Sequence, residues 1–262
     1  MTIDENIPSN SESLPLADKW AVVTGSSSGI GRAIAQELAQ AGCNIIVHGF
    51  QKAEAAEQLA ATIRQLNRQS HVILADISQP SECKNFCRQA WDTAPIDIWI
   101  NNAGADVLTG EAADFSFEQK LDRLWNVDVQ ATISLSRDCG QRMQQQGSGT
   151  ILNIGWDQAE TGMAGDSGEL FAAIKGAIMA FTRSLAKSLA PQVRVNCLAP
   201  GWIQTAWSES ASDYWQKRAV SESLLQRWGT PQDVASTARF LVSPDAAFIT
   251  GQILHINGGQ QR

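Results

Sequence analysis

The sequence has no excess of basic residues. Its 262 residues include 20 Lys and Arg against 27 Asp and Glu, which gives a formal net charge of −7 and an isoelectric point near 5.0. A protein with this charge has no positive field with which to neutralise a phosphate backbone or an anionic membrane surface. We therefore expect neither a nucleic acid nor a membrane among its partners.

Cysteine and histidine are also scarce. The five cysteines are an odd number, no two of them form a Cys-x-x-Cys pair, and only three histidines are present. This pattern argues against a disulfide framework and against structural zinc, so we expect no metal site. The residues concerned are Cys43, Cys83, Cys87, Cys139 and Cys197, with His48, His71 and His255 far from them along the chain.

Long apolar runs are absent. No segment approaches the roughly 18 uninterrupted apolar residues of a membrane span. The first residues carry Asp4 and Glu5 where a secretory signal needs positive charge, and they contain no apolar stretch. We therefore predict a cytoplasmic protein.

What is present is the composition of an ordinary globular protein, with 44% apolar and 18% charged residues. At roughly 150 residues per domain, the length fits between one and two domains. Residues 1–15 are polar and rich in turn formers, so we predict a flexible tail there and a single domain over residues 16–262.

Short apolar runs alternate with helical stretches along the domain. Apolar strands separated by helices predict right-handed crossovers and a mostly parallel sheet covered on both faces. We therefore predict a doubly wound, Rossmann-like α/β fold of about seven strands. The predicted strands are Trp20–Val23, Asn44–Val47, His71–Leu74, Ile96–Ile100, Thr150–Ile154, Val193–Leu198 and Ile253–Ile256. A long helical region is predicted over 117–146, and the irregular stretch 202–229 is interpreted as a lid.

A glycine-rich turn follows the first predicted strand. It runs from Thr24 to Gly31 and reads Thr-Gly-Ser-Ser-Ser-Gly-Ile-Gly before a helix begins. Glycines at these positions allow a tight turn that brings backbone N–H groups and the helix N-terminus up to a pyrophosphate. A lone glycine turn is weak evidence, because a plain strand-to-helix connection needs the same residues.

Other motifs accompany this turn in a fixed order. They are Asp76 after the third strand, Asn101–Gly104 after the fourth, Lys175 within a helix, and Pro200–Thr205 after the sixth. The set resembles the short-chain dehydrogenase/reductase family from about residue 20 to 259. Segments 227–235 and 250–259 look most like its 3-oxoacyl-acyl-carrier-protein reductases. The resemblance implies an oxidoreductase that binds NAD or NADP.

The resemblance also assigns roles to individual residues. It implies contacts with the pyrophosphate, adenosine and nicotinamide ribose of the dinucleotide. The implied cofactor-binding residues are Gly25, Ser27, Gly29, Ile30, Asp76, Ile77, Asn102, Ala103, Gly104, Lys175, Pro200, Gly201, Ile203 and Thr205. The choice between NAD and NADP stays open, because segment 48–52 contains no acid and Lys52 is a weak candidate for binding a phosphate.

Two catalytic positions depart from the family pattern. The family has a Tyr four residues before the Lys, whose phenol protonates the carbonyl oxygen, and here Phe171 stands four residues before Lys175. The family Ser at the end of the fifth strand aligns with Trp156, and a shift of register would bring Gly155 or Asp157 there instead. None of these residues carries a hydroxyl group.

Two other family positions match. By resemblance, Asn126 corresponds to the Asn that holds a proton-relay water, and Lys175 to the residue that binds the nicotinamide ribose. We predict from the departures that conventional carbonyl reduction is impaired or absent, because a general acid is worth roughly 10²–10⁴ in rate. Trp156 and Phe171 form either an apolar surface beside the nicotinamide or part of the core.

Three other functions stay open. The protein could be an active oxidoreductase with a substitute proton donor, for which Tyr214, the only tyrosine, with Arg218 four residues later is one candidate. It could be a non-catalytic partner subunit of an active relative, or a structural subunit that binds no nucleotide.

The family usually forms homodimers or homotetramers through helices that correspond to 117–146 and 166–190. The substrate, a small molecule or an acyl group, is not determined. Trp202, Trp207, Trp215 and Trp228 indicate either an apolar pocket or an interface.

Overall fold

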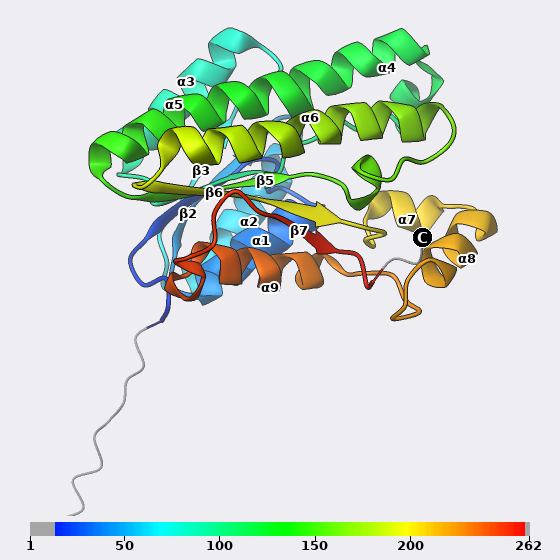
Figure 1. The fold of residues 1–262 in the computed structure, drawn as a ribbon. Helices are drawn as coiled ribbons and strands as arrows, with labels where there is room; N and C mark the ends of the chain where they lie inside the picture. The colour runs from blue at the N-terminus through cyan, green and yellow to red at the C-terminus, as the bar shows by residue number, and fades with distance from the viewer. Residues whose placement is uncertain (1–13, 260–262) are drawn as a thin grey trace, which may run out of the picture.

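The computed structural model describes residues 14–259. These residues contain one seven-stranded parallel sheet with the strand order β3-β2-β1-β4-β5-β6-β7 (Figure 1). This confirms the predicted doubly wound, Rossmann-like single domain. The strands are β1 (Trp20–Val23), β2 (Asn44–Gly49), β3 (Ser70–Leu74), β4 (Ile98–Asn101), β5 (Gly149–Ile154), β6 (Val193–Pro200) and β7 (Ile253–Ile256). The predicted tail falls almost entirely on residues 1–13, which lie outside the described residues.

Helices cover both faces of the sheet. In Figure 1, α3, α4, α5 and α6 lie above it, α1, α2 and α9 lie below it, and α7 and α8 lie beyond the arrowheads of β6 and β7. The helices are α1 (Gly29–Gln40), α2 (Ala53–Gln65), α3 (Pro80–Thr93), α4 (Phe117–Leu124), α5 (Ala131–Gln146), α6 (Asp166–Leu189), α7 (Ala206–Ser210), α8 (Asp213–Ser221) and α9 (Pro231–Val242).

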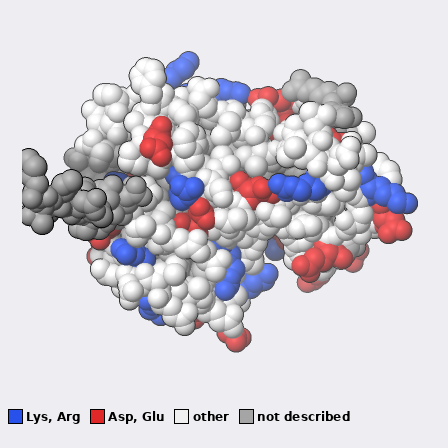
Figure 2. Space-filling model, turned by 90° about the horizontal axis from the view of Figure 1, so that it is seen from below, with Lys and Arg blue, Asp and Glu red and all other residues white. Residues whose placement is uncertain are grey.

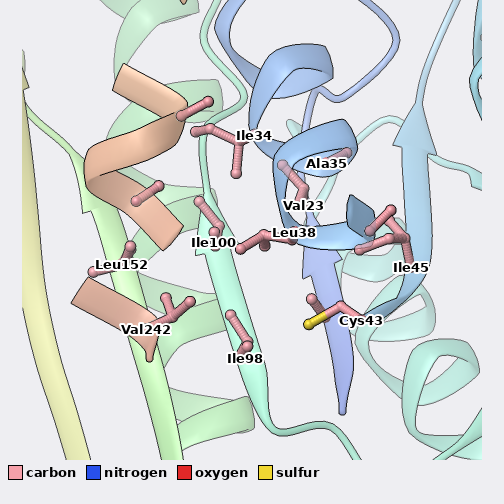
Figure 3. Close-up of a cluster of buried hydrophobic side chains, with 14 of the residues drawn as sticks. Val23, Ile34, Ala35, Leu38, Cys43, Ile45, Ile98, Ile100, Leu152 and Val242 are labelled. Carbon is pink, nitrogen blue, oxygen red and sulfur yellow. The ribbon is translucent and has the colours of Figure 1, made fainter. Parts of the chain in front are cut away.

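The strands are apolar because both faces of the sheet are buried. Figure 3 shows the cluster beneath it, where Val23 of β1 and Ile45 of β2 pack against Ile34 and Leu38 of α1. Burying a side chain of this size is worth about 1.5–3 kcal/mol. Cys43 belongs to the same cluster, and burial raises its pKa to about 12. All five cysteines are buried with free thiols.

Two predicted elements differ from the structure. The helical region 117–146 is divided by a π-helical stretch, η2 (Trp125–Gln130), which separates α4 from α5. The stretch 202–229 was predicted to be irregular, and this is wrong, because it contains α7 and α8. These helices have only 5 and 9 residues, too few turns to show a clear apolar period in the sequence.

The face below the sheet carries charges of both signs. Figure 2 shows acidic and basic side chains interspersed on this face, with uncharged surface between them. Among the described residues, no helix is both long enough and apolar enough to cross a membrane.

Candidate functional site

The site lies where the order of the strands reverses. β1 pairs with β2 on one side and with β4 on the other, and ligands of such sheets bind beyond the carboxyl ends of the strands at this point. The Thr24 hydroxyl oxygen accepts hydrogen bonds from the N–H groups of Asn102 and Ala103, each at 2.9 Å. These bonds hold the glycine turn after β1 against the chain that leaves β4.

The glycine turn leads into the N-terminus of α1 at this crevice. Gly25 has a φ of +63°, and a Cβ added there would lie 2.8 Å from the Cα of Ala103. The N-cap of α1 is Ser28, whose side chain makes no capping hydrogen bond. The first-turn N–H groups of α1 therefore have no capping side chain, and they and the helix dipole favour an anion such as a pyrophosphate.

His48, at the end of β2, holds the glycine turn in place through hydrogen bonds. Its Nδ1 accepts a hydrogen bond from the Gly25 N–H at 3.0 Å, and its Nε2 donates to the Ala75 carbonyl at 3.1 Å. Burial lowers the pKa of His48 to about 4, so the ring is neutral near pH 7. From the sequence, His48 was only part of the segment that selects the cofactor, and its contact with the turn was not predicted.

Several residues predicted to bind the cofactor surround this crevice, but some of their side chains have structural partners. The Asn102 amide donates to the carbonyl oxygens of Thr24 at 3.0 Å and Gly25 at 3.3 Å. Asp76 accepts hydrogen bonds from the N–H and the hydroxyl of Ser78. Ile77 is buried in the cluster above the sheet.

A cavity of about 370 Å³ opens beside the crevice. Ligand pockets typically have volumes of about 300–1,000 Å³. The predicted site residues that line the cavity are Ile30, Trp156, Phe171, Lys175, Pro200, Gly201, Ile203 and Thr205. The structure thus brings together one residue from α1, one that follows β5, two from α6, and the end of β6 with the residues after it.

Trp156 and Phe171 lie on the wall of this cavity. Their ring centroids are 6.3 Å apart and the rings meet edge to face at 66°. Both side chains are half-buried, and Phe171 also packs against a small apolar cluster that includes Ile174. Of the two interpretations made from the sequence, a surface that faces the site fits this geometry better than a plain core role.

Lys175 forms a buried ion pair at the base of the cavity. Its Nζ lies 2.8 Å from Oδ2 of Asp128, and the side chains are 14% and 2% exposed. The other oxygen of Asp128, Oδ1, accepts a hydrogen bond from the Ala105 N–H at 2.8 Å. Asp128 belongs to the π-helical stretch η2.

This ion pair corrects the prediction for Asn126. Asn126 is exposed at the surface, and the residue that reaches Lys175 is Asp128, two positions later. A π-helical turn contains more residues than an α-helical turn, so it changes which side chains face inward. The sequence analysis missed Asp128, and the signal that could have found it is an acid between two valines, Val127 and Val129.

Tyr214 is not placed to act on a ligand in the cavity. Its side chain is 62% exposed, and it does not line the cavity. Its ring packs edge-on against Trp215 at 5.1 Å. The structure therefore does not support Tyr214 as a substitute proton donor.

Asp157 is buried directly after Trp156 and does not line the cavity. The side chain is 3% exposed, its Oδ2 accepts a hydrogen bond from the Asn257 amide at 3.2 Å, and its Oδ1 has no partner. Burial raises the pKa of Asp157 to about 6. No group of three or more His, Cys, Asp or Glu residues that could hold a metal is found among residues 14–259.

The raised pKa predicts an unusual dependence of stability on pH. Since the folded protein holds this proton more tightly than the unfolded chain, Asp157 lowers the free energy of unfolding as the pH rises from about 4 to about 6. The total loss is at most about 3 kcal/mol. Urea denaturation of wild type and Asp157→Asn across this range measures it.

We expect Asp157→Asn to remove this decline and to be the more stable protein at pH 7. The comparison is made as a difference between the two proteins, because every other titrating group is common to both. If the free energy of unfolding had the same slope against pH for wild type and variant between pH 4 and 6, Asp157 would titrate normally in the folded protein.

The comparisons with known proteins agree with this geometry. A family model described as enoyl-(acyl carrier protein) reductase matches residues 25–261. The chain is 31% identical over 244 residues to the 3-oxoacyl-acyl-carrier-protein reductase FabG of Staphylococcus aureus, with 92% of this chain and 97% of the relative covered. It is 34% identical over 250 residues to nodulation protein G of a Rhizobium species, with 93% and 97% covered.

Solved structures show the same architecture. A 7α-hydroxysteroid dehydrogenase, complexed with NADH and 7-oxo glycochenodeoxycholic acid, matches with a TM-score of 0.86 and 31% identity over 96% of this chain and 97% of that one. A short-chain dehydrogenase from Burkholderia cenocepacia, in complex with NADP, matches with a TM-score of 0.84 and 32% identity over 94% and 98%. With the glycine turn at the reversal point of the sheet and the cavity beside it, these matches show that the chain belongs to the short-chain dehydrogenase/reductase family.

Proposed function

We propose that the protein binds a nicotinamide dinucleotide in the crevice at the glycine turn but does not reduce carbonyl compounds by the usual route of its family. The residues present fit the dinucleotide. The turn is held by Thr24 and His48, and the uncapped N-terminus of α1 offers N–H groups to a pyrophosphate. Relatives of the same fold have been solved with NADH and with NADP.

The observation that carries the second half of the proposal is the chemistry of the cavity wall. A nicotinamide dinucleotide supplies a hydride, and reduction of a carbonyl also requires a proton at its oxygen. The family takes that proton from a Tyr, assisted by a Ser, and we propose that Phe171 and Trp156 occupy these two positions. Their rings lie edge to face on the wall, 6.3 Å apart. Neither ring has an O–H group to donate.

Among the described residues that line the cavity, we find no substitute for the lost donor. Ser167 and Thr205 place hydroxyls on the wall, but the pKa of an aliphatic hydroxyl lies far above the neutral range in which general acids work best. Lys175 is paired with Asp128, and Asp157 faces Asn257. We therefore propose a nucleotide-binding protein that senses or carries the dinucleotide without conventional turnover.

The end of β2 bears on the choice of cofactor. No carboxylate stands between His48 and Lys52, and Phe50 there is 53% exposed. An acid at this position bonds the ribose hydroxyl of NAD and repels the phosphate of NADP. Because this acid is absent and Lys52 is exposed, we propose that NADPH binds at least as tightly as NADH.

Titration of the purified protein with NADH and NADPH tests this proposal. We expect saturable quenching of tryptophan fluorescence with energy transfer to the reduced nicotinamide, because Trp156 and Trp202 line the cavity beside the crevice. The same samples, given simple ketones, should show no turnover above the buffer control. Absence of saturable binding by either nucleotide, or ketone turnover at rates usual for enzymes of about 1 s⁻¹ or more, would overturn the proposal.

A further inference from the structure

One side of the cavity is a wall of indole rings. The ring centroid of Trp202 lies 6.1 Å from Trp207, 5.5 Å from Trp215 and 6.1 Å from Trp228. Trp207 also lies 6.0 Å from Trp215 and 6.3 Å from Trp228. All four side chains line the cavity, and we call them the indole wall. They come from four different segments, so the wall is assembled only in the folded protein.

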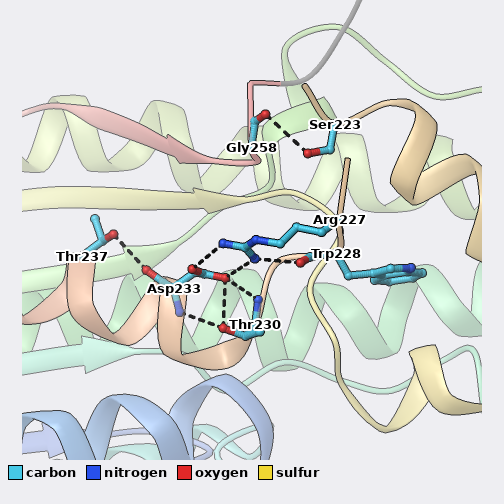
Figure 4. A network of polar contacts seen from close by, with 7 residues as sticks. All are labelled: Ser223, Arg227, Trp228, Thr230, Asp233, Thr237 and Gly258. Atoms are coloured by element: carbon cyan, nitrogen blue, oxygen red, sulfur yellow. Dashed lines mark hydrogen bonds and ion pairs between the residues drawn. The ribbon is translucent and has the colours of Figure 1, made fainter. Parts of the chain in front are cut away.

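The indole wall is held in place by polar contacts behind it. Arg227 donates two hydrogen bonds to the Asp233 carboxylate, at 2.8 and 3.0 Å, and Asp233 also accepts from Thr230 at the start of α9. Figure 4 shows this network, with the indole of Trp228 pointing away from it. Trp228 is only 8% exposed. This network thus fixes the loop before α9, and the Trp228 indole of that loop forms part of the indole wall.

The charges around the wall are already neutralised within the protein. The guanidinium of Arg218 lies 5.8 Å from the ring centroid of Trp202 and 5.2 Å from that of Trp215. Glu222 pairs with Arg218 at 2.6 Å and accepts a hydrogen bond from Nε1 of Trp202 at 2.8 Å. The attraction of these two rings for a cation is therefore satisfied by Arg218.

The rest of the lining offers no free charge to a ligand. Among the described residues that line the cavity there is no Asp or Glu, and the one cation, Lys175, is paired with Asp128 at 2.8 Å. A charged ligand group buried here would lose its hydration without gaining a free partner of opposite charge, which is costly. The cavity is thus suited to an uncharged ligand.

We propose that the cavity binds an uncharged, flat, mostly apolar ring compound, gripped by Trp202, Trp207, Trp215 and Trp228, in preference to a charged molecule or a flexible acyl chain. Stacked or edge-on aromatic pairs gain about 0.5–1.5 kcal/mol beyond the area they bury. A flexible chain gains no such term and loses its rotational freedom on binding. This inference deepens the proposed function, because it names the ligand class of the same site.

The test measures the binding of four probes by isothermal titration calorimetry near neutral pH, with and without saturating NADPH. The probes are 2-naphthol, 2-naphthoate, 2-naphthyltrimethylammonium and decanol, which separate ring shape from charge and chain flexibility. We expect 2-naphthol to bind at least about tenfold more tightly than each of the others. Equal or tighter binding of any other probe, or no binding of 2-naphthol, would overturn the inference.

Variants of Trp215 make the test specific to the wall. Trp215→Leu keeps an apolar side chain but removes a flat face, and we expect it to weaken 2-naphthol about tenfold while leaving decanol nearly unchanged. Trp215→Phe keeps a ring and should retain most of the preference. The matched control is Trp125→Leu, because Trp125 is 49% exposed and does not line the cavity. An equal loss of 2-naphthol binding in Trp215→Leu and Trp125→Leu would contradict the assignment.

Failure of this inference and failure of the proposed function give different results. If neither nucleotide binds, the proposed function is wrong, while the ranking of probes in nucleotide-free protein still decides the ligand class. If nucleotide binds but the probes show no preference for the neutral ring, only the assignment of the ligand is wrong. Urea denaturation of each variant verifies that the fold is intact.

Discussion

A variant that carries Asp128→Asn, Trp156→Ser and Phe171→Tyr should oxidise NADH or NADPH with a simple ketone at least about 100-fold faster than wild type. The new phenol would stand four residues before Lys175, on the same face of α6 and on the wall of the cavity. The serine adds a hydroxyl that can stabilise the developing alkoxide. Asp128→Asn frees the Lys175 charge, which then lowers the pKa of the neighbouring phenol.

Two controls separate this effect from a general change in the protein. Asp128→Asn with Trp156→Ser, but with Phe171 retained, should recover little activity because it lacks the acid. Phe248→Tyr places a phenol on a fully exposed residue and should recover none. If the triple variant binds nucleotide as wild type does and still shows no gain, the loss of the donor does not explain the missing turnover.

Lys175→Met should lower the free energy of unfolding by about 3 kcal/mol, because removing one partner of a buried ion pair leaves the other charge uncompensated. Asp128 is 2% exposed and would keep only the hydrogen bond from the Ala105 N–H. Adding Asp128→Asn to Lys175→Met removes the unpaired Asp128 charge and should restore most of the lost free energy of unfolding. Urea denaturation with a constant m-value measures wild type and both variants.

The matched control is an ion pair on the surface. Arg88 and Asp92 are 61% and 62% exposed and lie 3.1 Å apart, so Arg88→Met should change the free energy of unfolding by less than about 0.5 kcal/mol. If Lys175→Met lowered the free energy of unfolding as little as Arg88→Met does, water, and not Lys175, would compensate the Asp128 charge.

The fold could be predicted from the sequence because its signals are local and repeated. Each strand is an apolar run such as Ile45–Val47, and each of the first six is followed by a helix that begins after turn-forming residues. The glycine turn could be placed for the same reason, since Gly25 stands two residues after the end of β1 and takes a positive φ there. Parallel pairing then brings Thr24 and Asn102 together without further information.

The side chain beside Lys175 could not be predicted in the same way. Asn126 and Asp128 are two residues apart on one helical segment, and which of them faces inward depends on the phase of the helix. The π-helical turn changes that phase, and no pattern in the sequence marks it. The ion pair between Asp128 and Lys175 joins residues 47 positions apart and exists only after α4, η2 and α6 have packed.

The indole wall was predicted only as an alternative between a pocket and an interface. Trp202, Trp207, Trp215 and Trp228 are separated by short segments whose helices, α7 and α8, are too short to be stable alone. The direction in which each indole ring points is set by tertiary contacts, such as the hydrogen bond that Nε1 of Trp202 donates to the Glu222 carboxylate. The burial that raises the pKa of Asp157 also arises only from tertiary packing, in which Asp157 accepts a hydrogen bond from Asn257, 100 residues later.

The central claim is that the protein holds a reduced nicotinamide but delivers no proton to a carbonyl. The measurement that tests it most directly is a single-turnover experiment, in which protein in excess over NADPH is mixed with a ketone. The absorbance of the bound reduced nicotinamide is then followed. We predict stable absorbance in a sample whose tryptophan fluorescence shows that the nucleotide is bound. Stoichiometric loss of that absorbance, with formation of the alcohol, would contradict the account.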